Sequence, residues 1–130
     1  MSIWSSIMTK IKDISITIME KEISPGQDVH GNIDIDYHGR FDSIVINSQI
    51  QNSNDVFSYT SLNGKKINYP YARLSVSPND IGATRNVKFI ANTKHIPSTN
   101  SSNVKFRAAI IQEHKEVASH IASIKIVKVS

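Results

Sequence analysis

Residues 23–37 carry the pattern that decides the fold class: Ile23-Ser24-Pro25-Gly26-Gln27-Asp28-Val29-His30-Gly31-Asn32-Ile33-Asp34-Ile35-Asp36-Tyr37. A Pro-Gly turn leads into a segment whose odd-numbered positions from Val29 to Tyr37 are apolar or glycine, while its even-numbered positions are polar. This period of two predicts a half-buried antiparallel strand with Gly31 on its inward face. Because Gly31 has no side chain, we expect another group to pack closely on that strand.

Composition limits the classes of protein to which the chain can belong. It has 130 residues and no cysteine, which excludes disulfides, thiolate nucleophiles and cysteine-based metal sites. No apolar run approaches the about 20 residues of a membrane span, and residues 1–12 lack the features of a signal peptide. We therefore expect a cytoplasmic protein. None of the five histidines has the spacing of a local metal clip, so we expect no metal and no cofactor.

The first segment differs from the rest of the chain. Trp4, Ile7, Met8 and Ile11 recur at the spacing of one helical face, which predicts a short amphipathic helix over residues 1–12. Such a helix either caps an open end of the remaining domain or lies on a membrane surface or a partner, because it is too short to be stable alone.

From residue 13 onward the pattern is that of strands. Alternation predicts strands over residues 14–19, 29–37, 44–50, 56–60, 73–77, 87–92, 104–111 and 117–129. Asn63-Gly64 is typical of a two-residue hairpin turn, and Pro70 interrupts its return arm, which makes that arm an edge strand or a loop. A slip in the apolar phase near Ala122 predicts a bulge or bend. The chain is thus predicted to be all-β, with an antiparallel immunoglobulin-like sandwich over residues 13–130.

Several segments together resemble the arrestin-like family of β-sandwich domains. Residues 24–33 are similar to the "pro-gly-acid-x-val-x-gly-x-ile" signature at the second strand of that family, and residues 41–50 resemble the strand after it. Residues 87–99, with Ile96-Pro97-Ser98, and residues 104–111 resemble two later segments. The start is closest to prokaryotic arrestin-like proteins of the sporulation-control kind. Arrestins pair two such domains and this chain has room for one; the residues of the arrestin polar core have no match here. The resemblance implies a non-catalytic scaffold or adaptor.

Charge is distributed unevenly along the chain. Residues 1–65 carry 5 basic and 8 acidic side chains, or −3, whereas residues 66–130 carry 10 basic and 3 acidic side chains, or +7. This asymmetry raises the alternative of a binder of nucleic acid or an anionic surface, with Lys88, Lys105 and Arg107 as a positive stripe. The other interpretation is that strands of both halves interleave in the sheets and disperse the charge.

The expected function is protein binding through edge strands and surface loops, without catalysis. Tyr69-Pro70-Tyr71 is an amphipathic element of the kind found at interfaces, or else a lid over one sandwich edge. The partner-binding candidates are Tyr69, Pro70, Tyr71, Trp4, Ile7, Ile11, Lys88, Lys105 and Arg107. We expect a protein partner and a homodimer formed through an edge strand, with residues 1–12 as a further membrane contact; nucleic acid is not the expected partner. A hydrolase would instead need a concave site with a perturbed carboxylate or histidine.

Overall fold

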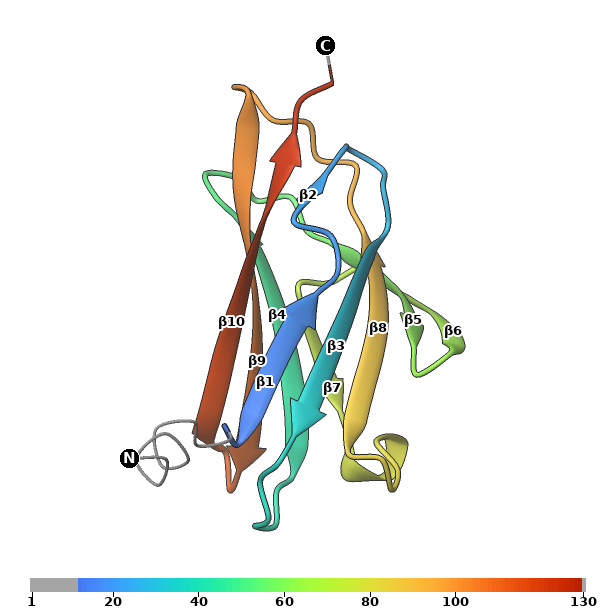
Figure 1. Cartoon of the computed structure of the whole chain (residues 1–130), viewed down its shortest axis with the longest axis vertical. Coiled ribbons are helices and arrows are strands. Elements are labelled where there is room, and N and C mark those ends of the chain that lie inside the picture. The colour runs from blue at the N-terminus through green and yellow to red at the C-terminus, as the bar shows by residue number, and fades with distance from the viewer. Residues whose placement is uncertain (1–11, 130) are drawn as a thin grey trace, which may run out of the picture.

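The structure is a computed structural model that describes residues 12–129, and it consists of two five-stranded sheets packed face to face (Figure 1). One sheet has the strand order β1-β3-β8-β5-β6 and the other the order β2-β10-β9-β4-β7. The strands are β1 (Ile14–Ile18), β2 (Glu22–Ile23), β3 (Val29–Ile35), β4 (Ser43–Ile50), β5 (Ser58–Leu62), β6 (Lys65–Tyr69), β7 (Arg73–Val76), β8 (Asn86–Asn92), β9 (Ser101–Gln112) and β10 (Lys115–Val127).

These sheets confirm the prediction of an all-β sandwich. All pairs are antiparallel except β2 with β10, which run parallel over two residues each. The helix predicted over residues 1–12 falls outside the described residues, apart from Lys12, which is not helical. In the described part of the chain, the only helical element is the 3-10 turn η1 (Pro78–Asp80).

The core lies between the two sheets, where mostly isoleucine and valine, with some leucine and alanine, surround four buried aromatic rings. Phe89 packs against Tyr59 and Phe106 with ring centroids 5.8 Å away in both cases, and Phe106 packs against Phe57 at 5.0 Å. Gly31 of β3 is directly paired with Phe89 of β8, and a Cβ on Gly31 would overlap the phenyl ring. The expectation that Gly31 permits close packing is therefore confirmed.

Two further details of the sequence pattern have different outcomes. Asn63 and Gly64 both have positive φ, 49° and 81°, and they connect β5 to β6 as the predicted hairpin turn. The bulge in the last strand is not near Ala122 but between Glu116 and Ala118. The prediction of a slip at Ala122 was wrong because Ala118, His120 and Ala122 share the inward side of this half of β10, while Val117 and Ile121 are 43% and 46% exposed.

One edge of the first sheet is closed by a side chain of the second. β1 forms that edge, and the backbone N–H of Ile16 donates to Nδ1 of His120 on β10 at 2.9 Å. The opposite edge is β6, whose only strand partner is β5. Within the described residues, β6 is therefore the edge of this sheet that is left open.

Candidate binding groove

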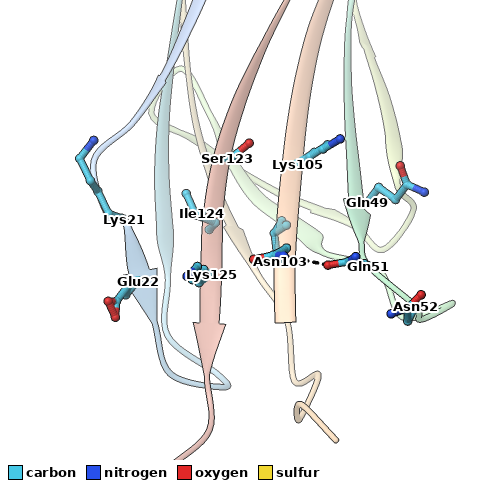
Figure 2. A pocket seen from close by; sticks show the side chains of 11 residues that line it. Lys21, Glu22, Gln49, Gln51, Asn52, Asn103, Lys105, Ser123, Ile124 and Lys125 are labelled. Atoms are coloured by element: carbon cyan, nitrogen blue, oxygen red, sulfur yellow. Dashed lines mark hydrogen bonds between the residues drawn. The ribbon is translucent and has the colours of Figure 1, made fainter. Parts of the chain in front are cut away.

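A polar groove of about 740 Å³ lies on the side of the second sheet that faces away from the core (Figure 2). Its polar lining consists of lysines and side-chain amides with one acid and one hydroxyl: Lys21, Glu22, Gln49, Gln51, Asn52, Asn103, Lys105, Ser123 and Lys125. Val104 and Ile124 complete the lining from the buried positions between them. We call this the lysine–amide groove.

Strand alternation places these side chains on one face. In β9, Val104 is fully buried while Asn103 and Lys105 are exposed, and in β10 the buried Ile124 separates Ser123 from Lys125. The pairing registers then bring the exposed positions into rows. Gln49 of β4 pairs with Lys105, and Lys105 pairs with Ser123.

The same registers bring three lysines together. Lys125 pairs with Asn103, two positions along β9 from Lys105, so the Cα atoms of Lys105 and Lys125 lie about 8 Å apart for standard strand spacings. The backbone N–H of Lys125 donates to the carbonyl of Lys21 at 3.0 Å, which places Lys21 beside Lys125 on its other side. Figure 2 shows the three side chains on three adjacent segments.

The groove is positively charged and rich in groups that both donate and accept hydrogen bonds. Its three lysines are opposed by Glu22 alone among the lining residues. On its amide side, the Asn103 side chain donates to Oε1 of Gln51 at 2.8 Å, shown as a dashed line in Figure 2. Anions are attracted to such a surface, and side-chain amides add directional hydrogen bonding.

The structure separates the predicted basic stripe. Lys105 and Arg107 lie on the outer face of the second sheet, but Lys88 belongs to β8 and lies on the outer face of the first sheet. Arg107 forms an ion pair with Glu116, and this hydrogen bond is the main reason that the pKa of the Glu116 carboxyl lies below its ordinary value. The prediction that Lys88, Lys105 and Arg107 form one stripe was therefore wrong; only Lys105 lines the groove.

The other predicted site residues have separate locations. Tyr69 ends β6, and its ring packs edge-on against Tyr71 with centroids 5.1 Å apart. Tyr71 is 62% exposed, and Pro70 between them is also exposed. Trp4, Ile7 and Ile11 lie outside the described residues, so the structure does not bear on them.

A chain of hydrogen bonds at the end of the sandwich has the residue types of a hydrolase relay. Nδ1 of His95 is 2.6 Å from Oδ2 of Asp55, and Nε2 of His95 is 2.9 Å from the hydroxyl of Ser102. The bond to His95 lowers the pKa of the Asp55 carboxyl. The adjacent hollow is lined by Asp55 and His95 but not by Ser102. This cluster ties the β4–β5 and β8–β9 connections to the start of β9.

Most of the groove was missed by sequence reasoning. Lys21, Lys125, Gln49, Gln51 and Asn103 were not among the predicted residues. For Gln49, Lys105 and Lys125 the signal available was the alternation within the strands predicted over 44–50, 104–111 and 117–129, which marks outward positions. Lys21, Gln51 and Asn103 lie just outside the predicted strands. Pairing registers, which sequence alternation does not supply, were needed to bring them together.

Within residues 12–129, no group of three or more metal-ligating side chains occurs that could hold an ion. No helix of this part of the chain is long and apolar enough to cross a membrane.

Comparison with known proteins identifies the fold but no family. No family model matches the chain, and no curated protein matches it. The solved structure of BslA, a bacterial hydrophobin, is 19% identical, with 89% of this chain and 99% of that chain covered and a TM-score of 0.56. A lipoprotein from Bacteroides thetaiotaomicron is 11% identical, with coverage of 94% and 85% and a TM-score of 0.53. A conjugative transposon lipoprotein from Bacteroides eggerthii is also 11% identical, with coverage of 88% and 96% and a TM-score of 0.50.

These comparisons correct two predictions. The arrestin resemblance was wrong, because the solved structures that share this fold are a hydrophobin and lipoproteins rather than arrestin-like proteins. The segments behind it have a simpler cause, since Gly31 makes room for Phe89 and a Pro-Gly turn suits many sandwiches. The expected cytoplasmic location is contradicted by the two lipoproteins among these neighbours. At such identities the likeness shows the shared β-sandwich fold alone.

Proposed function

We propose that this β-sandwich is a non-catalytic binding module whose lysine–amide groove holds an extended anionic ligand. The observation that carries the proposal is that Lys21, Lys105 and Lys125 line one groove from three adjacent segments of one face, with Glu22 as the one acidic residue in the lining. Exposed charges attract anions over about 8–10 Å at physiological salt, so a cluster binds where single lysines do not. We also infer an immunoglobulin-like topology, supported by the two face-to-face, largely antiparallel sheets.

The test is binding of a labelled polyanion as a function of salt. Inorganic polyphosphate is a suitable first probe because it presents charge with little other chemistry. We expect binding to the full chain at low ionic strength and its loss when the salt rises to about 0.5 M, where screening acts over only a few ångströms. The double variant Lys105→Gln/Lys125→Gln should bind at least about tenfold more weakly, because two of the three charges are gone.

A matched control removes the same charge elsewhere. Lys65 and Lys66 are exposed on β6 in the opposite sheet, and Lys65→Gln/Lys66→Gln changes the net charge equally. If this variant loses as much affinity as the groove variant, net charge rather than the groove causes binding, and the proposal fails. Absence of binding of any polyanion at low salt also refutes it.

The non-catalytic part of the proposal has its own test at Ser102. A serine nucleophile needs an accessible hydroxyl and a base within hydrogen-bond reach; Ser102 has the base in His95 but does not line the neighbouring hollow. We expect no labelling of Ser102 by a fluorophosphonate probe. Labelling that Asp55→Asn abolishes would identify an activated serine and overturn this part of the proposal.

Protein binding at the open β6 edge is the second candidate function, and it is favoured by the exposed Tyr71 beside that edge. An edge strand can pair with another chain or with a second copy. Lys65 and Lys66 on the same strand oppose close self-pairing through their charges. Light scattering over a wide concentration range tests the homodimer, and a mass that stays monomeric throughout rejects it.

A further inference from the structure

We infer that the ligand of the lysine–amide groove is an acidic polysaccharide, a chain that combines negative groups with many hydroxyls; the inference rests on the proposed function of that groove. Polar side chains other than lysine make up most of its polar lining: Gln49, Gln51, Asn52, Asn103 and Ser123. Attraction of charge alone does not require so many neutral hydrogen-bonding groups. A ligand with hydroxyls can donate to the carbonyl oxygen of an amide side chain and accept from its NH2 group, because a hydroxyl both donates and accepts.

The arrangement of charge and amides suits a polymer that runs across the strands. The lysines lie on the β2–β10–β9 side, whereas Gln49 lies on the neighbouring strand β4 and Gln51 directly follows it. Four neighbouring segments span three strand spacings, about 14 Å, which is the length of a short oligomer rather than of one small ion. Figure 2 shows this lateral sequence from Lys21 to Gln49 and Gln51.

A nucleic acid fits this surface less well. Single-stranded nucleic acids are held by stacking of bases on aromatic side chains as well as by positive charge. No aromatic residue among residues 12–129 lines the groove, and the described aromatic side chains nearest to it in sequence, such as Phe106, face the core. The groove would therefore bind the phosphates of a nucleic acid but would offer no stacking partner to its bases.

An acidic peptide also fits less well. Extended peptides bind to sheets chiefly by adding a strand to an open edge, with side chains in apolar pockets. The two strands at the centre of the groove are paired on both sides there: β9 lies between β4 and β10, and β10 at Lys125 lies between β9 and β2. The apolar lining residues Val104 and Ile124 are buried and offer no pocket for an anchoring side chain.

The experiment compares three polyanions of equal charge per unit but different chemistry, and one uncharged ester, on the full chain. Calorimetric titrations use polygalacturonate oligomers, their methyl esters, inorganic polyphosphate and poly-glutamate, matched in length. We expect polygalacturonate to bind more tightly per charge than polyphosphate or poly-glutamate, because only it supplies hydroxyls to the amides. The methyl ester keeps the hydroxyls but has no charge, and it should bind at least about tenfold more weakly.

Amide variants separate this inference from the proposed function. Gln49→Ala and Asn103→Ala leave every lysine in place, so we expect polygalacturonate affinity to fall about fivefold or more and polyphosphate affinity to fall by a clearly smaller factor. Asn68→Ala on β6 is the matched control for loss of an exposed amide on the other sheet. Equal binding of all three polyanions, or no effect of the amide variants, would reject a polysaccharide ligand but leave the proposed anion site standing. Absence of binding of any polyanion would reject both the polysaccharide ligand and the anion site.

Discussion

The replacement of Gly31 by alanine tests the packing that organises the core. In the structure, the added Cβ would lie 2.8 Å from Cε1 of Phe89 and still closer to Cζ and Cε2 of the same ring, whereas real Cβ atoms essentially never approach another heavy atom within 3.0 Å. The ring cannot simply turn away, because Tyr59 and Phe106 both pack against it. Gly31 itself has no positive φ, so space rather than backbone freedom is what alanine would lack.

The cost follows from two opposing effects. Overpacking a buried site costs typically about 1–3 kcal/mol, and a ring held between two other buried rings places this site at the upper end. Replacing glycine by alanine restricts the unfolded chain and returns about 0.4–1 kcal/mol. The net loss in the free energy of unfolding should therefore be about 2 kcal/mol. For a domain of this size, that lowers Tm by about 8 °C.

Thermal and urea unfolding of four proteins provide the assay: the original chain, Gly31→Ala, Phe89→Leu and the double variant. Phe89→Leu alone leaves a cavity and costs about 1–2 kcal/mol. In the double variant the ring atoms that clash are absent, so the combined loss should be smaller than the sum by at least about 1 kcal/mol. Strictly additive losses, or a Tm of Gly31→Ala within 2 °C of the original, approximately half a kcal/mol, would falsify this account of the β3–β8 contact.

Two other perturbations have defined outcomes. Burial, and then the nearby Lys12 charge, lower the pKa of His120, so the neutral ring is the form that accepts the Ile16 N–H. The contribution of this bond to stability should be complete above about pH 6.5 and should be lost as the pH falls through the lowered pKa. His120→Gln keeps an acceptor, and its stability in urea unfolding should depend less on pH in that window. Burial raises the pKa of Tyr59, whose hydroxyl donates to the carbonyl of Ala72 at 3.1 Å. Tyr59→Phe should lower the free energy of unfolding by about 0.5–1.5 kcal/mol, with an unchanged dependence on urea concentration. An unaltered midpoint of urea unfolding would show that this hydrogen bond contributes nothing to stability.

Local signals in the sequence predicted the fold class well. Alternation in residues 29–37 corresponds to β3 with its buried and exposed sides, and Asn63-Gly64 corresponds to a turn with positive φ at both positions. These features depend on neighbours in sequence, so the sequence contains enough information to predict them. β2 was missed because two residues are too few to show a period, and it forms only by pairing with β10.

The last strand shows where alternation misleads. Val117 and Ile121 suggested an inward face, but both are exposed, and the inward positions hold Ala118 and Ala122. The inward position between these two alanines holds His120, which accepts the N–H of Ile16 from β1. The sequence pattern reports hydrophobicity, whereas the packing depends on the space left between two sheets, which only the fold determines.

The groove could not be predicted for a related reason, and that same reason makes it testable. Its lysines come from residues 21, 105 and 125, which no sequence window joins, and the registers of β2, β9 and β10 bring them together. Within β9, however, the exposed Lys105 lies between Val104 and Phe106, which are fully buried. Because successive residues of a strand face opposite sides, a change at Lys105 alters the groove while the two core neighbours keep their contacts. Surface changes of this kind shift stability by only about 0.5 kcal/mol, so a loss of binding in Lys105→Gln/Lys125→Gln can be attributed to the groove itself.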